Sequence, residues 1–352
     1  MSDVLQLSKP PREIAIVMLS ALGDAVHVLP VLTALKRKWP ESRITWVIQP
    51  VPYEFVKDHE AVDDFIIFKR RRGLDAVASY RELRQAFTGR HFDLLINLQV
   101  YLKAGLITAL APADIKLGFD RKRARDMNWL FTNRKIPARR MQHVQDQYFE
   151  FVEYLGIDPE PVEWRINITP AERAAQSQFF EPLGRACAIV VGTSKPAKNW
   201  APDRYARVIE ALEGEFGLRA VLVGGPSAIE REAAERIVAT ARIQPVNALG
   251  NDIRRLVYLL DGASLVISPD TGPLHIARAL DKPVVGLYGY TNPRRYGPYR
   301  KYTDLIVDGY ARAPGEDYPL SMEYRTDGMS RVTVSEVLEK VRLAMTKYVA
   351  RV

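Results

Sequence analysis

Residues 265–289 constrain the fold more than any other stretch, because they contain a complete strand–helix–strand unit. Leu265–Ser268 and Val284–Tyr288 are short apolar runs, typical of buried strands. Between them, Pro273 stands where proline suits the start of a helix. The preceding turn therefore lies at the carboxyl end of a buried strand. Ligands bind at that edge of open α/β sheets, and a helix N-terminus there favours a phosphate.

Strands and helices alternate along most of the chain, which predicts parallel βαβ units. At 352 residues the chain exceeds one ordinary core, and a proline-rich stretch at 158–162 resembles a linker. We therefore predict an α/β protein of two Rossmann-like halves with parallel sheets, facing each other across a cleft. The predicted parts are an N-terminal domain (1–160), a second domain (161–330) and a C-terminal helix (331–352), for which packing back on the first domain is left open. The main predicted strands are 14–19, 43–48, 65–68, 94–98, 188–191, 220–223, 265–268, 284–288 and 304–307, and the long predicted helices are 25–38, 76–88, 142–155, 201–216, 228–240 and 334–348.

Composition excludes several classes of protein. A single cysteine, Cys187, rules out an intrachain disulfide framework and is typical of a reducing compartment. No apolar run approaches the ~20 residues that span a bilayer, and the first residues lack the basic-then-apolar pattern of a secretory signal. We expect a cytoplasmic protein.

Positive charge is concentrated in residues 115–140, where nine Lys and Arg face two Asp, a balance of +7. This segment is either a solvated basic loop or a docking surface for a polyanion or an anionic membrane face. Aromatic and basic residues are not interleaved here, and no nucleic-acid motif accompanies them, so we expect no nucleic-acid partner.

The first strand–helix turn argues against two common nucleotide-binding folds. Gly23 is its only glycine, so the G-x-G-x-x-G pattern is missing, and a Walker-A loop is missing too. Asp24 would cap a helix that begins at Ala25, which is worth ~1 kcal/mol. Alternatively, it is a general base, a role that contributes ~10²–10⁴ in rate. His27 lies three residues further on, on the same helical face as Asp24, and by itself is expected to be a packed or tuning residue.

Three strand-end loops in the second half offer phosphate and sugar chemistry: Gly192–Lys198, Gly224–Ser227 and Asp270–His275. Together they indicate a nucleotide-diphosphate site. Glu230 and Glu232 follow the second loop, either as acids of a first helical turn or as ribose contacts. No Asp-x-Asp pair and no metal-ligand spacing occurs, so no metal ion is expected. Positive charge and helix N-termini would stabilise a leaving diphosphate instead.

Four segments together resemble glycosyltransferase family 9, the ADP-heptose:lipopolysaccharide heptosyltransferases. They are Leu19–Pro30, Gly192–Trp200, Ser268–His275 and Pro283–Gly289. The middle segment, 118–135, is similar to the heptosyltransferase I branch, which adds the first heptose to the Kdo residues of the inner core. The resemblance implies a GT-B fold, with the acceptor on the N-terminal domain and ADP-heptose on the C-terminal one. It also implies inverting transfer without a metal ion or cofactor.

The resemblance also implies roles for individual residues. Asp24 matches the catalytic base, and Lys198 matches the lysine that acts on the donor diphosphate. Acceptor-binding basic residues are expected at Lys103, Arg121 and Arg125. The acceptor would be an anionic lipid-linked oligosaccharide, met by peripheral contact at the inner face of the inner membrane. The residues that match donor-binding positions are Thr193, Ser194, Lys198, Asp270, Thr271, Gly272 and His275.

Other functions remain open from the sequence. Nothing in it identifies the sugar directly, so transfer of another nucleotide-activated sugar is the nearest alternative. A GT-B-like sugar-nucleotide epimerase would convert the donor with no acceptor present. A non-catalytic polyanion-binding protein would use the positive charge alone.

Overall fold

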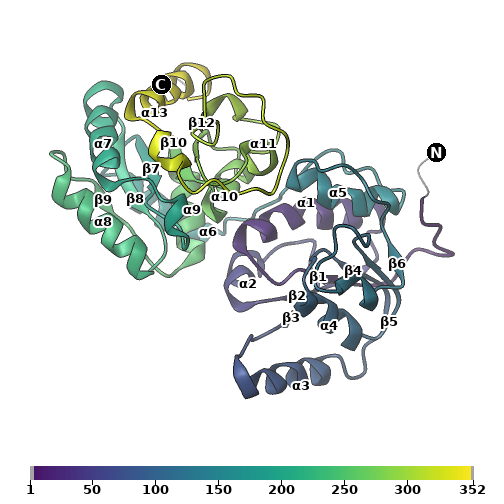
Figure 1. The fold of residues 1–352 in the computed structure, drawn as a ribbon. Helices are drawn as coiled ribbons and strands as arrows, with labels where there is room; N and C mark the ends of the chain where they lie inside the picture. The colour runs from purple at the N-terminus through teal and green to yellow at the C-terminus, as the bar shows by residue number, and fades with distance from the viewer. Residues whose placement is uncertain (1–3, 350–352) are drawn as a thin grey trace. The chain divides into compact units, whose positions relative to one another are not determined.

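The computed structural model describes residues 4–349, which fall into two compact units divided between Asn167 and Ile168. Each unit contains one six-stranded parallel sheet with helices on both faces (Figure 1). The α/β class with two parallel sheets is therefore confirmed. Residues 350–352 of the predicted C-terminal helix lie outside the described residues.

The first unit has the strand order β3-β2-β1-β4-β5-β6, and all neighbouring strands are parallel. Its strands are β1 (Glu13–Val17), β2 (Arg43–Ile48), β3 (Asp64–Ile67), β4 (Phe92–Asn97), β5 (Ala113–Gly118) and β6 (Arg134–Lys135). Its helices are α1 (Leu22–Lys38), α2 (Pro50–Val56), α3 (Ala76–Ala86), α4 (Leu102–Leu110) and α5 (Val144–Tyr154), with 3₁₀ turns η1 (Gly73–Asp75) and η2 (Asn128–Phe131).

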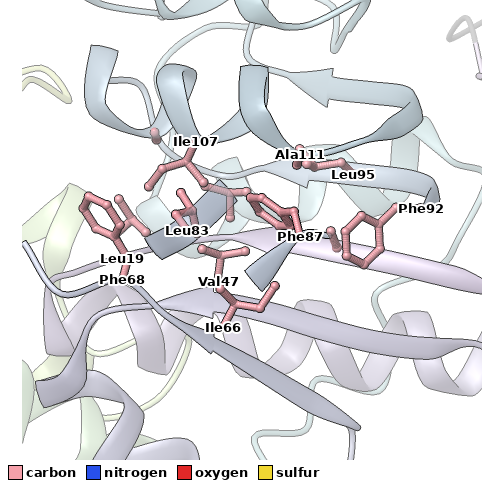
Figure 2. Close-up of a cluster of buried hydrophobic side chains, with 13 residues drawn as sticks. Leu19, Val47, Ile66, Phe68, Leu83, Phe87, Phe92, Leu95, Ile107 and Ala111 are labelled. Carbon is pink, nitrogen blue, oxygen red and sulfur yellow. The ribbon is translucent and has the colours of Figure 1, made fainter. Parts of the chain in front are cut away.

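The core of the first unit lies on both sides of its sheet. α1 packs against α5 on one face, whereas α3 and α4 cover the other. Figure 2 shows the cluster beneath α3 and α4, where Val47, Ile66 and Leu95 of the strands meet Leu83 and Ile107 of the helices. Burial on both faces explains why the central strands are continuous apolar runs rather than alternating ones.

The second unit repeats this plan with the strand order β12-β11-β10-β7-β8-β9, again all parallel. Its strands are β7 (Ala186–Val190), β8 (Arg219–Val223), β9 (Val246–Asn247), β10 (Leu265–Pro269), β11 (Val284–Tyr288) and β12 (Ile306–Asp308). Its helices are α6 (Pro170–Phe180), α7 (Pro202–Phe216), α8 (Ala228–Thr240), α9 (Ile253–Gly262), α10 (Gly272–Ala279), α11 (Pro293–Tyr296), α12 (Gly328–Arg331) and α13 (Val334–Lys347), with 3₁₀ turns η3 (Pro196–Lys198) and η4 (Thr303–Leu305).

The C-terminal helix α13 packs on its own unit. Its buried residues Val337, Val341 and Ala344 lie on one face of the helix, which meets α7, β11 and β12. This apolar face is therefore buried within the second unit.

Several short elements were missed from the sequence. α2 has seven residues and two prolines, and β6 and β9 have two residues each, so none carries a readable period. α6 was also missed, although Thr169 and Glu172 form a capping box at its start. The first helix begins at Leu22, three residues earlier than predicted.

Candidate functional site

Both sheets have a topological switch point, where the chain reverses the direction in which it adds strands. The switch lies between β1 and β4 in the first unit and between β10 and β7 in the second. Ligands of open α/β sheets bind beyond the carboxyl ends of the strands at such points. Asp24 follows β1, Thr193–Lys198 follows β7 and Asp270 follows β10, so the predicted residues stand at these two positions.

Asp270 is the centre of a buried polar cluster in the second unit. Its Oδ2 lies 2.7 Å from the Lys198 ammonium and accepts a hydrogen bond of 2.5 Å from the Thr291 hydroxyl. Its Oδ1 lies 3.5 Å from His275 Nε2. The Lys198 ammonium also donates to the Asp270 carbonyl at 3.0 Å. The structure therefore brings three of the predicted donor residues into direct contact.

The charge of the Asp270 carboxylate is strongly favoured. Burial opposes that charge, but the hydrogen bond with His275 and the positive charge of Lys198 hold the pKa of Asp270 well below its usual range. The carboxylate in turn fixes the Lys198 ammonium at the switch point. A cation held in this way is suited to an anionic group of a ligand.

The loop after β7 is closed by its own hydrogen bonds. The Thr193 amide donates to Asn199 Oδ1 at 2.7 Å, and the Thr193 hydroxyl donates to the Lys195 carbonyl at 3.0 Å. Thr193 is buried, whereas Ser194 is exposed at the tip of the loop. The loop therefore presents Ser194 and Lys195 outward while it holds Lys198 against Asp270.

Helix α10 begins beside this cluster. Gly272 is its first residue, Thr271 precedes it as the N-cap, and Pro273 follows as the second residue. Proline has no backbone N–H, and in the first turn of a helix this costs nothing, because an N–H there has no acceptor within the helix. The helix therefore directs the positive end of its dipole toward the Asp270–Lys198 region.

Two acidic residues, Glu230 and Glu232, follow the loop after β8 and differ in their surroundings. The Glu230 carboxylate accepts from the Gly225 amide at 2.7 Å and from the Ser227 hydroxyl at 2.6 Å. These bonds make Glu230 a support of the glycine loop at the start of α8, whereas Glu232 is exposed. Of the two roles that the sequence left open, Glu230 therefore has the structural one, as an acid of the first turn of α8.

Asp24 lies in the first turn of α1, not at its N-cap as the sequence suggested, because the helix starts earlier. Its Oδ2 accepts from the Ala21 amide at 2.9 Å, and its Oδ1 accepts from the Tyr148 hydroxyl of α5 at 3.2 Å. The carboxylate therefore stabilises the helix start and is oriented by a second helix. It is partly exposed at the switch point.

His27 is a packed residue, as expected. Its exposed fraction is 4%, and its Nδ1 lies 2.9 Å from Gln145 Oε1. Gln145 Nε2 returns a hydrogen bond of 2.9 Å to the His27 carbonyl. This pair ties α1 to α5 below Asp24 and so helps to fix the position of the Asp24–Tyr148 contact.

Lys103 lines a basic pocket of about 340 Å³ in the first unit. Burial lowers the pKa of Lys103, and the nearby charge of Arg70 lowers it further. An excess of positive charge is thus held in one concave place, which favours an anionic ligand. The residues that line this pocket are Phe68, Arg70, Arg71, Arg72, Gly73, Ala76, Ser79, Tyr80 and Lys103.

Arg121 and Arg125 do not line this pocket. Both are exposed in the segment after β5, and the Arg121 guanidinium lies 4.5 Å from the centre of the Trp129 ring. Elsewhere in the basic segment, Arg123 turns inward and bonds Asp120 and Glu150. The Arg125 amide donates to the Val100 carbonyl at 2.7 Å, so this segment lies beside the start of α4, but of the three predicted acceptor residues only Lys103 lines the pocket.

An exposed apolar surface borders both sets of basic residues. Tyr101 and Leu102 are 48% and 38% exposed, and Met127 and Leu130 are 61% and 53% exposed. Asn128 Nδ2 donates to the Tyr101 carbonyl at 2.7 Å, so the two pairs are adjacent. We call these four residues the apolar tip.

Sequence reasoning missed several residues of the site. Arg70–Arg72 is a run of three arginines that follows Lys69 after the predicted strand 65–68, which was a readable signal. Thr291 also follows a predicted strand and carries a hydroxyl. Gln145 is the second residue of α5 and Tyr148 lies one turn further on, and nothing local marks either one, because their role comes from the packing of α5 against α1.

Two features are absent from residues 4–349. No three side chains among His, Cys, Asp and Glu are grouped so that they could hold a metal ion. No helix combines the length and the apolar character needed to cross a bilayer.

The chain matches known proteins over most of its length. Residues 80–323 match the model of glycosyltransferase family 9 (heptosyltransferase). The chain is 29% identical to the lipopolysaccharide core heptosyltransferase OpsX of Haemophilus influenzae, covering 85% of each chain. It is 30% identical to a lipopolysaccharide heptosyltransferase 1 of Escherichia coli, covering 86% of this chain and 92% of that one.

A solved structure agrees with these matches. It is the E. coli heptosyltransferase WaaC with ADP-2-deoxy-2-fluoro heptose, which is 25% identical and has a TM-score of 0.71. The match covers 94% of this chain and 99% of the other. Together with the two parallel sheets, it confirms the GT-B class that the sequence predicted.

Proposed function

The chain belongs to glycosyltransferase family 9, the heptosyltransferases, and from this premise we propose that it transfers heptose from ADP-heptose to the Kdo region of the lipopolysaccharide inner core. One observation carries the proposal: Lys198, Asp270 and His275 form a charged cluster at the switch point of the second sheet. A diphosphate is the natural ligand of such a position. The ADP-sugar bound to the solved relative supports the choice of donor.

We propose that Lys198 and the start of α10 stabilise the leaving ADP. As the bond between the anomeric carbon and the diphosphate oxygen breaks, its electron pair leaves with ADP. The Lys198 ammonium and the α10 N-terminus then offset the added charge. Thr193, Ser194, Thr271 and Gly272 would complete the binding of the diphosphate through hydroxyl and amide groups. In this mechanism no metal ion takes part.

We propose that Asp24 is the general base on the acceptor side. It would accept the proton of the acceptor hydroxyl as that oxygen attacks the anomeric carbon, which inverts its configuration. The hydrogen bonds from Ala21 and Tyr148 leave the carboxylate oriented and partly exposed. Because the carboxylate is partly exposed where it supports the helix start, it can also take a proton from a bound hydroxyl.

The basic pocket is the proposed acceptor site. Lys103 and Arg70–Arg72 would bind the carboxylates of Kdo or the phosphates of the lipid anchor, because the pocket gathers their positive charge. Arg121 and Arg125 would contact more distant anionic groups of the same acceptor, outside the pocket.

We further propose that the enzyme works in the cytoplasm, in peripheral contact with the inner face of the inner membrane. The apolar tip supports this, since exposed apolar side chains beside Lys and Arg are typical of surfaces that enter an anionic lipid interface. Lys103 of the pocket directly follows Leu102 of the apolar tip, so the acceptor site would lie beside the lipid interface.

A product assay tests this function. Purified enzyme is incubated in EDTA with ADP-heptose and a Kdo-bearing lipid acceptor, and the glycosidic product is identified by mass spectrometry and NMR. We expect one heptose to be added, with inversion. Parallel reactions with UDP- and GDP-sugars test the alternative donors. Absence of product with ADP-heptose, together with transfer from another donor, would make the proposed sugar wrong.

A further inference from the structure

Two stacked tyrosines stand at the surface of the second unit. The rings of Tyr290 and Tyr324 are 4.8 Å apart between centroids and 14° from parallel. Tyr324 is 47% exposed although its ring is apolar. The Lys195 ammonium lies 5.2 Å from the Tyr324 ring and 5.8 Å from the Tyr290 ring. We call Tyr290, Tyr324 and Lys195 the tyrosine wall.

The wall is held in place by the segment that carries it. Tyr324 belongs to residues 309–327, which join β12 to α12. The Arg325 amide donates to the Tyr290 carbonyl at 3.0 Å, and the Arg325 guanidinium pairs with Glu316 at 3.0 Å. Asn292 Nδ2 donates to the Pro319 carbonyl at 2.8 Å. The exposed ring is therefore pre-oriented rather than mobile on a free loop.

The wall adjoins the charged cluster. Tyr290 directly precedes Thr291, whose hydroxyl donates to Asp270. Lys195 is on the loop after β7, where its carbonyl accepts from Thr193. The wall is therefore joined to the cluster on two sides, through Thr291 and through the loop after β7.

Strand order indicates which part of a donor would meet the wall. The cluster follows the central strands β7 and β10, with the glycine loop after β8 on one side and Tyr290 after β11 on the other. A nucleoside would then lie on the side of the glycine loop. A diphosphate bound at the cluster would then direct its sugar toward β11 and the tyrosine wall.

We propose that the exposed face of Tyr324, backed by Tyr290 and Lys195, is the surface on which the transferred sugar ring stacks. This inference rests on the proposed function and adds the element that recognises the sugar. One face of a pyranose consists of C–H groups, which pack on an aromatic ring, while its hydroxyls remain free for polar partners such as the Lys195 ammonium. Residues 309–327 then take part in sugar selection.

The test compares binding of ADP and ADP-heptose by calorimetry in Tyr324→Ala, Tyr324→Phe and Leu320→Ala. Leu320 is the matched control because it is 37% exposed in the same segment. In Tyr324→Ala we expect ADP-heptose binding to weaken about tenfold while ADP binding stays within twofold. Tyr324→Phe and Leu320→Ala should bind both ligands like the wild type.

Three results would overturn the proposal. Equal weakening of ADP and ADP-heptose would mean that Tyr324 contacts the nucleotide or only supports the fold. No change for either ligand would mean that the wall is not used. Equal weakening in Leu320→Ala would assign the effect to the segment rather than to the ring. The affinity of nucleotide sugar relative to free nucleotide is also measured for the UDP–UDP-glucose and GDP–GDP-mannose pairs. If the wild type binds one of these pairs and not ADP-heptose, the proposed donor is wrong, but the effect of Tyr324→Ala on sugar binding can still be measured with that pair.

Discussion

Replacing Asp270 by asparagine removes the negative charge at the centre of the second unit's cluster. The Asp270 and Lys198 side chains are 8% and 17% exposed, and their charged atoms are 2.7 Å apart. Loss of one member of a buried ion pair costs about 3–5 kcal/mol, because the other charge is left uncompensated. Lys198 is the more exposed partner and can turn toward water, so we expect the lower end, about 3 kcal/mol. In a unit of this size that corresponds to a fall in Tm of roughly 6–12 °C.

The assay is urea unfolding of the wild type, Asp270→Asn, Lys198→Met and the double variant. The double variant should be more stable than Asp270→Asn, because it no longer buries an unpaired ammonium. The pKa of Asp270 lies below its usual range, so its contribution is present above about pH 4 and is lost as the pH falls further. The difference in the free energy of unfolding between wild type and Asp270→Asn should therefore become smaller only below about pH 4.

Two outcomes would refute this reasoning. If Asp270→Asn lowers the free energy of unfolding by less than about 1 kcal/mol, the Lys198–Asp270 pair behaves like an ion pair exposed to solvent. A double variant no more stable than Asp270→Asn would mean that Lys198 does not depend on Asp270. In either case the cluster would not hold Lys198 in place in advance of the ligand.

The remaining predictions concern the acceptor side and stability in acid. Lys103→Ala should raise the KM for the acceptor about tenfold or more and leave donor binding unchanged, whereas Arg90→Ala, outside the pocket, should do neither; steady-state kinetics would contradict this if both variants behaved alike. Met127→Asp with Leu130→Asp should lower binding to vesicles containing anionic phosphatidylglycerol by about tenfold or more, while Val51→Asp, at the same 61% exposure as Met127, should not; equal losses in a sedimentation assay would remove the special role of the apolar tip. Glu172 accepts two hydrogen bonds from Arg254, which together with those from Thr169 lower the pKa of Glu172 to about 2, so Glu172→Gln should cost about 1–2 kcal/mol of unfolding free energy above pH 4.5 and progressively less toward pH 2; a cost that does not change with pH in denaturant titrations would be inconsistent with that pKa.

Much of the fold was readable because the central strands are unbroken apolar runs. Strands such as 14–19 and 284–288 are buried on both faces, so nearly all of their residues are apolar and the strand appears in the sequence as a continuous apolar run. Short elements such as β6 and β9 lack this signal, since two residues cannot show a period. The start of α1 was misplaced because Leu22 and Gly23 gave no local sign that they are helical, and Asp24 fits an N-cap equally well.

The site was readable where its residues follow strands in the chain. Asp270 directly follows β10 and Lys198 ends the loop after β7, and the topology brings those strand ends together. Tyr148 could not be found in this way, because its contact with Asp24 joins residues 124 positions apart through helix packing. The stacking of Tyr324 on Tyr290 likewise depends on the course of an irregular segment, which no period in the sequence describes.

The most direct test of the central claim is the rate of heptose transfer by Asp24→Asn. Asp93→Asn is the control, because its carboxylate also accepts backbone amides, from Arg12 and Glu13, at the opposite edge of the same sheet. With saturating ADP-heptose and Kdo-bearing acceptor, we predict that Asp24→Asn lowers kcat by about 10²–10⁴ while ADP affinity is unchanged, and that Asp93→Asn transfers heptose at close to the wild-type rate. A folded Asp24→Asn protein with near-wild-type kcat would contradict the assignment of the base and the mechanism built on it.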